Sequence, residues 1–234
     1  MNCWASCLGN CTNDSSGEHY VSASIFRDGT KAILVSGLKW MVTESQLVGL
    51  SRATAKILCS KHNNSLSEFD NEACKLSEFM RQIKKNPLKN FSIDINGKYL
   101  EKWAIKTFYN LGVLGVFNET ILPQDSLIRY IYCDSKIDSG IGLYFVRGRT
   151  ISDDIGDYFQ WHAIKNKSAI DEVIGMQFYI SGVCFIINLN PVHHEDNIKI
   201  ESSFCDQDEV YYRPDVILLD NNNSSNVNKI TFKW

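Results

Sequence analysis

The sequence predicts an α+β fold in two parts, and three observations predict it. Apolar residues recur every three or four positions in two stretches that begin near Leu66 and Lys98, as in helices that bury one face. After about residue 126, short runs rich in Ile, Val, Tyr and Phe alternate with turn residues, which is typical of strands. Cysteine and histidine gather within the first 62 residues, so the N-terminal part differs in character from the rest.

The composition is that of a globular protein with a substantial core. The chain has 234 residues, of which 44% are hydrophobic and 22% charged, and this excludes a disordered protein. Its apolar runs are all shorter than the roughly 18 residues that span a bilayer. The first ten residues, MNCWASCLGN, lack the basic and apolar segments of a signal peptide. We therefore expect a cytoplasmic protein without membrane contact, whose eight cysteines are reduced rather than a disulfide framework.

The elements of the N-terminal part begin with strands. Residues 20–26 are expected to form a short strand, and "KAILVSGLKWMV", residues 31–42, a second strand or a strand pair with a turn at Gly37. Residues 46–58 fit no single pattern. A helix follows from Leu66 to about Ile83, because its apolar residues keep helical spacing and Pro87 limits it.

A domain boundary is expected between residues 87 and 96, so that residues 1–90 and 91–234 form separate domains. The first range carries a formal charge of +3 and the second −6. A mildly basic N-terminal domain suits nucleic-acid binding, although a difference of this size carries little weight.

The second domain is expected to be one helix followed by strands. "KYLEKWAIKTFYNLG", residues 98–112, has an apolar face and ends at a glycine. The runs at 127–133, 140–148, 172–189, 215–219 and 229–234 are expected to be strands of a mostly antiparallel β-rich region.

Two half-sites in the N-terminal domain have the spacing of zinc ligands. Cys59 and His62 are separated by two residues, and structural zinc takes four ligands in a tetrahedron. The N-terminal cysteines offer the other two, either as Cys3 with Cys7 or as Cys7 with Cys11, of which the second pair is preferred. The alternative is that these cysteines are simply buried thiols.

A zinc clamp of this kind would bring Glu18 and His19 close to Asn63, the residue that follows the second half-site. A neutral imidazole can deprotonate water, and a carboxylate and an amide oxygen suit Mg²⁺. Together these groups would suit phosphodiester hydrolysis. The alternatives are a structural histidine, a solvated glutamate and a helix-capping asparagine.

The pattern C-x3-C … SGEH … LC-x2-HN, within residues 3–85, resembles the HNH nucleases, also called His-Me finger or ββα-metal nucleases, in their zinc-stabilised form. The resemblance implies an N-terminal ββα-metal module with His19 as general base and with Glu18 and Asn63 as ligands of catalytic Mg²⁺ or Mn²⁺. It implies four ligands of structural zinc: Cys7, Cys11, Cys59 and His62. The chain departs from the family pattern in having Glu18 where aspartate is common, and in lacking the middle asparagine, near Thr54, and the proline after the histidine.

The expected function is therefore that of a metal-dependent endonuclease that hydrolyses the phosphodiester bonds of nucleic acid, with DNA favoured over RNA as the substrate. The resemblance also suggests a bacterial restriction or anti-phage setting. Residues 91–234 would bind a protein partner, recognise substrate or join two copies of the chain. The alternative is a zinc-binding adaptor for nucleic acid or protein that has no catalytic activity, which the missing asparagine favours.

Overall fold

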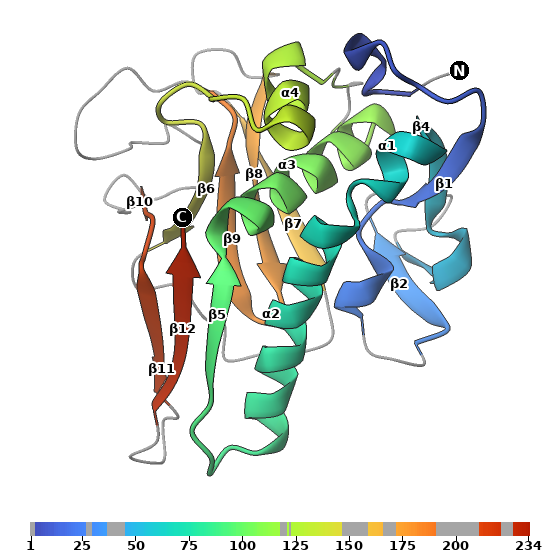
Figure 1. The fold of residues 1–234 in the computed structure, drawn as a ribbon. Coiled ribbons are helices and arrows are strands. Elements are labelled where there is room, and N and C mark those ends of the chain that lie inside the picture. Colours follow the sequence, from blue (N-terminus) through green and yellow to red (C-terminus); the bar gives the residue numbers. More distant parts are fainter. Residues whose placement is uncertain are drawn as a thin grey trace. The chain divides into compact units, whose positions relative to one another are not determined.

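The computed structural model confirms a mixed α+β fold (Figure 1). It describes the following residues: 3–26, 30–36, 45–117, 121, 123–146, 159–165, 172–190, 211–220 and 227–234. The chain forms two compact units, one of residues 1–71 and 102–137 and the other of residues 72–101 and 138–234. These units alternate along the chain, whereas the sequence predicted two consecutive domains, 1–90 and 91–234. The difference arises because residues 102–137 pack with the N-terminal residues.

The first unit is built on an antiparallel strand pair. Strand β1 (Ser15–His19) pairs with β4 (Thr54–Cys59), with an irregularity in register between Ser16 and Glu18. Helix α1 (Ser60–Asn64) starts directly after β4. The chain between the two strands forms a separate hairpin of β2 (Ala32–Ser36) and β3 (Ser45–Gly49). The described residues of this part also form three short 3₁₀ helices: Ser6–Leu8, Ala23–Ile25 and Leu50–Arg52.

The expected strand over residues 20–26 is wrong. The strand lies earlier, in β1, and a 3₁₀ turn at Ala23–Ile25 follows it. The turn is held by serines, since Ser22 Oγ donates to the Asp70 carboxylate and Ser24 Oγ to the Asp70 carbonyl oxygen, at 3.4 Å. The expected pair within residues 31–42 begins with β2, but the turn at Gly37 lies outside the described residues.

Both expected helices are confirmed. Helix α2 (Ser67–Lys85) buries the apolar residues that predicted it, among them Phe69 and Leu76. Helix α3 (Gly97–Val113) is buried almost all round rather than on one face, and its buried residues include Lys102, Lys106 and Asn110. No helix within the described part of the chain is both long and apolar enough to cross a membrane.

The run at 127–133 forms helix α4 (Asp125–Cys133), so the strand expected there is wrong. Its composition is typical of strands, but its buried residues Leu127, Ile128 and Ile131 share one helical face. The helix ends at Asp134, which has a left-handed backbone conformation with φ of 52°.

The described residues of the second unit form two sheets, in agreement with a mostly antiparallel β-rich region. The five-stranded sheet has the order β10-β6-β9-β8-β7, and its paired strands are all antiparallel. The strands are β6 (Gly142–Val146), β7 (Phe159–Lys165), β8 (Val173–Ile180), β9 (Val183–Asn188) and β10 (Tyr211–Tyr212). Every residue of β9 is buried, as expected of a central strand with both faces covered.

The other sheet has the order β11-β12-β5, with β11 at Val216–Asp220, β12 at Val227–Lys233 and β5 at Ser92–Asn96. Strand β12 is antiparallel to β11 and parallel to β5. The sequence had not indicated β5 or β7.

Leucine-to-alanine substitutions test the core of the first unit. Leu58, one residue before the end of β4, is 1% exposed, whereas Leu47 on β3 is 69% exposed. We expect Leu58→Ala to lower the free energy of unfolding by about 2–5 kcal/mol, because it removes buried methyl groups and leaves a cavity. The matched change Leu47→Ala is expected to cost about 0.5 kcal/mol or less. Chemical denaturation measures both, and equal losses would contradict the described packing.

Candidate metal centre

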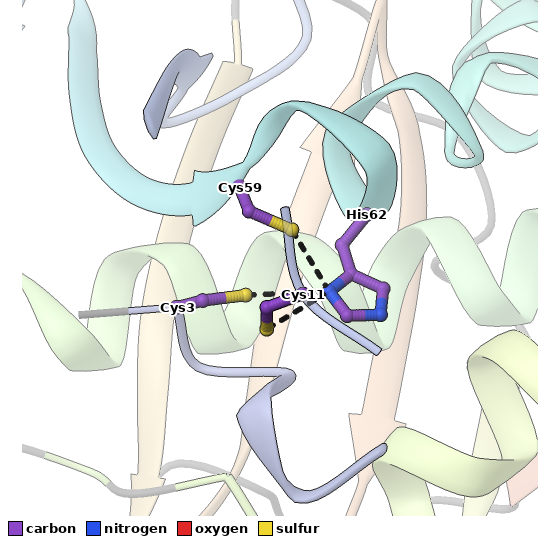
Figure 2. Close-up of side chains that lie close together, drawn as sticks. All are labelled: Cys3, Cys11, Cys59 and His62. Carbon is purple, nitrogen blue, oxygen red and sulfur yellow. Dashed lines mark hydrogen bonds between the residues drawn. The ribbon is translucent and has the colours of Figure 1, made fainter. Parts of the chain in front are cut away.

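Three thiols and one imidazole converge in the first unit. The ligand atoms of Cys3, Cys11, Cys59 and His62 all lie within 4.8 Å of one another. Figure 2 shows the three sulfur atoms directed at the ring of His62. Among the described residues, this is the one group of cysteine, histidine and acidic side chains with the compactness of a metal site.

Two of these residues are placed by local structure. Cys59 is the last residue of β4, and His62 lies in the short helix α1 that follows. The two residues are only three positions apart, and the start of the helix brings their side chains together. This is the half-site that the sequence predicted.

The other two residues are placed by hydrogen bonds between distant parts of the chain. The backbone N–H of Trp4 donates to the Ile57 carbonyl oxygen at 3.0 Å, which fixes Cys3 beside the end of β4. The loop that carries Cys11 is held to α1, because Ser60 Oγ donates to the Asp14 carboxylate. The Lys61 N–H also donates to Thr12 Oγ1 at 3.5 Å.

The distances fit tetrahedral zinc. His62 Nδ1 lies 3.4 Å from the sulfur of Cys3, 3.6 Å from that of Cys11 and 3.2 Å from that of Cys59. A tetrahedral zinc ion with ordinary Zn–S and Zn–N bond lengths separates its sulfur and nitrogen ligands by roughly 3.6 Å. The four residues could therefore hold a metal such as zinc.

The environment of His62 suits a metal ligand. Its other ring nitrogen, Nε2, lies 2.8 Å from Asn10 Oδ1. When the Nε2–H donates to that amide oxygen, Nδ1 keeps its lone pair for a metal ion. A histidine that binds a metal usually makes such a hydrogen bond with its other ring nitrogen. Burial lowers the pKa of His62, so the ring is neutral at physiological pH. Tyr132 of α4 packs edge-on against it, with ring centroids 5.0 Å apart.

The thiols differ in acidity. Burial opposes ionisation of Cys59, but hydrogen bonds from the backbone of His62 and Thr12 outweigh it and lower the pKa of Cys59 to about 7. Burial and the neighbouring sulfurs of Cys3 and Cys59 raise the pKa of Cys11 to about 12. One thiolate is therefore available near neutral pH, and a metal must displace the proton of Cys11.

Cys7 is not part of this cluster, which corrects the expected ligand set. Cys7 lies on the 3₁₀ turn Ser6–Leu8, where burial and the carboxylate of Asp125 raise its pKa. The turn directs Cys7 towards α4 and leaves Cys3 and Cys11, on either side of it, to reach His62. The spacing rule missed this because eight positions separate the two ligands, more than a single turn can span.

The expected catalytic residues Glu18 and His19 line a cavity of about 220 Å³. Its walls come from β1, the 3₁₀ turn after it, the start of α2 and the middle of α3. The lining residues are Glu18, His19, Ser22, Ala23, Ser24, Ser67, Asp70, Asn71 and Lys106. His19 is partly exposed there, whereas Glu18 is only 4% exposed.

Lys106 and Asn110 of α3 hold the Glu18 carboxylate. Glu18 Oε1 lies 2.6 Å from Lys106 Nζ and accepts a hydrogen bond from Asn110 Nδ2 at 3.0 Å. The same lysine amine lies 2.6 Å from Asp70 Oδ1. Burial alone would lower the pKa of Lys106, but the charges of Asp70 and Glu18 reverse this and raise it, so the amine is a cation.

Asn63 contacts the same strand at a different place. Its Nδ2 donates to Ser16 Oγ at 2.8 Å and, more weakly, to the Gly17 carbonyl oxygen at 3.5 Å. These hydrogen bonds hold α1 against β1, which is the arrangement expected if a metal ion bound at Cys59 and His62. The Asn63 amide and the Glu18 carboxylate are nevertheless engaged by separate partners.

Asn110 connects the cysteine cluster to the cavity. Trp4, which follows Cys3, donates its indole N–H to Asn110 Oδ1 at 3.2 Å. Asn110 Nδ2 in turn donates to Glu18 and to the His19 carbonyl oxygen, the latter at 3.1 Å. One amide therefore couples the position of Cys3 to that of both cavity residues.

Three residues of these sites were missed by sequence reasoning: Asp70, Lys106 and Asn110. Spacing indicated Cys3 only as a partner of Cys7. A signal existed for α3, since Lys102, Lys106 and Asn110 recur every four positions in a helix that is rich in large apolar residues. Polar groups on one stripe of a buried helix need partners, and such a stripe indicates an internal polar site.

Comparison of the chain with models of protein families, with curated proteins and with solved structures finds no match. The geometry of the two sites therefore carries the functional argument.

Serine substitutions distinguish the cysteines of the cluster from Cys7. We expect the purified wild-type chain and Cys7→Ser to hold about one zinc per chain, and Cys3→Ser to lose most of it, because a structural zinc needs all four ligands. Metal analysis by mass spectrometry measures the zinc content. Retention of zinc by Cys3→Ser together with its loss from Cys7→Ser would restore the ligand set expected from spacing.

Zinc affinity is expected to fall as the pH is lowered from 8 to 6. Zinc binds thiolates, so protons compete with it. The Cys11 thiol, with a pKa of about 12, carries a proton throughout this range, and the Cys59 thiol gains one below its pKa of about 7. Each competing proton weakens binding roughly tenfold per pH unit below the pKa of its ligand, so the loss of affinity should be steeper from pH 7 to 6 than from pH 8 to 7. Titration against a chromophoric chelator at pH 6, 7 and 8 measures the affinity, and an equally steep loss over both intervals would contradict ligation by Cys59.

Proposed function

We propose that this protein is a zinc-stabilised, metal-dependent endonuclease of the HNH type. One observation carries the proposal. The strand with Glu18 and His19 pairs antiparallel with the strand that leads directly into the helix bearing Asn63, and the Cys/His cluster lies at that junction. A strand pair followed by a helix agrees with the ββα order that the resemblance implies, and a zinc-compatible cluster at the junction supports the proposal.

The chemistry of the cavity supports hydrolysis. His19 is partly exposed at the cavity wall, where its imidazole can accept a proton from a water molecule. Glu18 and Asn63 are the proposed ligands of catalytic Mg²⁺ or Mn²⁺, although Asn63 is not among the residues that line the cavity. The ion, when bound, would stabilise negative charge on the scissile phosphate.

The proposed zinc has a structural role. It would join the N-terminal segment to β4 and α1, and through Trp4 and Asn110 it would fix the positions of Glu18 and His19. A closed set of four protein ligands is the mark of a structural rather than a catalytic zinc site.

The proposed substrate is DNA, in the restriction or anti-phage setting that the resemblance suggests. The C-terminal β-rich region would then bind a protein partner, recognise the substrate or join a second copy of the chain.

A second function, that of a zinc-binding adaptor without catalytic activity, is favoured by one observation. The Glu18 carboxylate is already neutralised by Lys106 and bonded to Asn110, so it is not free to hold a metal ion. In an adaptor, this ion pair would be a fixed part of the core.

Replacing His19 tests the nuclease. We expect His19→Ala to lower the rate of plasmid nicking by roughly 10²–10⁴-fold, because the substitution removes the general base. Nicking is measured with zinc-loaded protein, with and without added Mg²⁺ or Mn²⁺; avoiding a chelator keeps the structural zinc in place. His162→Ala is the matched control, since His162 lies on β7 in the second unit, and it should keep the wild-type rate.

Two outcomes would contradict the nuclease. One is a folded His19→Ala protein that cuts at the wild-type rate, and the other is a wild-type chain that binds DNA in a salt-dependent way and never cuts it. The second outcome would establish the adaptor instead.

A further inference from the structure

Lys106 occupies a place that has the ligands of a cation site. Its Nζ lies 2.6 Å from Glu18 Oε1, 2.6 Å from Asp70 Oδ1 and 3.2 Å from Ser22 Oγ. Two carboxylates and a hydroxyl are hard oxygen ligands, the kind that Mg²⁺, Mn²⁺ and Ca²⁺ prefer. The amine is fully buried, while Asp70 is 26% exposed on the cavity side.

Electrostatic attraction holds the Lys106 amine and the two carboxylates together. Two carboxylates at hydrogen-bond distance from one point repel each other strongly unless a cation lies between them. Lys106 supplies one positive charge, so the three groups together carry a net charge of −1. A divalent ion at the same point would neutralise both carboxylates, but it would repel the amine at such a short distance.

We propose that the Lys106 amine and a divalent cation are alternative occupants of the Glu18–Asp70 site, so that Lys106 closes the cavity to metal until the ion displaces it. The inference rests on the proposed function only in taking Glu18 as a ligand of the catalytic metal, and it adds Asp70 as a second carboxylate ligand. In this proposal the flexible four-carbon stem of the lysine carries the amine away from the two carboxylates. Lys106 thus regulates metal entry and is not itself a catalytic residue.

Metal binding to Lys106→Met tests the inference directly. Methionine keeps the apolar length of the stem and removes the charge. Isothermal titration of the zinc-loaded full chain with Mn²⁺ should show affinity at least tenfold higher for Lys106→Met than for wild type. Adding Asp70→Asn to Lys106→Met should abolish the gain, because one of the two carboxylates is lost. The zinc content is measured before and after titration, so that exchange at the cysteine cluster is recognised.

Lys102→Met is the matched control. Lys102 is also a buried lysine of α3, one turn earlier, but it pairs with Asp134 and lies over the rings of Phe69 and Tyr130. Its loss should destabilise the fold to a similar degree and leave Mn²⁺ affinity at the wild-type value.

Thermal unfolding keeps the test decisive if Lys106→Met is unstable. A melting temperature that rises with added Mn²⁺ in Lys106→Met, and not in Lys102→Met, supports the inference. A Lys106→Met protein that neither binds Mn²⁺ more tightly nor is stabilised by it overturns the inference, as does an equal gain in Lys102→Met.

The two proposals fail in different ways. Nicking by the wild type, without any gain of Mn²⁺ affinity in Lys106→Met, would refute the alternative occupancy and leave the nuclease in place. A gain of Mn²⁺ affinity in a chain that never cuts DNA would refute the nuclease and leave the cation site.

Discussion

The approach of Cys3, Cys11 and Cys59 to one nitrogen of His62 is the constraint on which the N-terminal architecture depends. Short elements such as β1 and α1 bury little apolar surface, so they need another source of stability. A zinc ion bound by these four residues would supply free energy that becomes folding free energy, because the site does not exist in the unfolded chain. The cluster joins the N-terminal segment, the end of β4 and the start of α1 at one point.

Helix α3 connects the Cys/His cluster to the cavity. Most of its residues are buried, yet Lys106 and Asn110 carry polar groups inward, where each is satisfied by several partners. A buried charge without its partner costs several kcal/mol, so a network of this kind selects one arrangement strongly. Because Asn110 bonds both to Trp4, beside the cluster, and to Glu18, the Cys/His cluster and the cavity are connected by hydrogen bonds.

The same network explains why the cavity is compatible with two functions. In the described structure a lysine amine neutralises the carboxylate that a catalytic metal would need. If the ion pair is permanent, it is a structural part of the core. If it is exchangeable, it controls entry of the metal. Which of the two holds depends on whether a divalent ion gains more free energy from binding the oxygens of Glu18 and Asp70 than the amine loses on leaving them.

The sequence by itself determined the features that depend on neighbouring residues. The helical spacing of apolar residues predicted α2 and α3, and the two-residue gap predicted Cys59 and His62 as a half-site. Both predictions succeeded because residues within one or two turns of each other lie close together independently of the rest of the chain. Tertiary structure decided the rest. Cys3 rather than Cys7 completes the cluster because Trp4 bonds to β4, and Lys106 and Asn110 reach Glu18 across a separation of up to 92 positions. Local spacing carries no information about such contacts, because the path of the folded chain sets them.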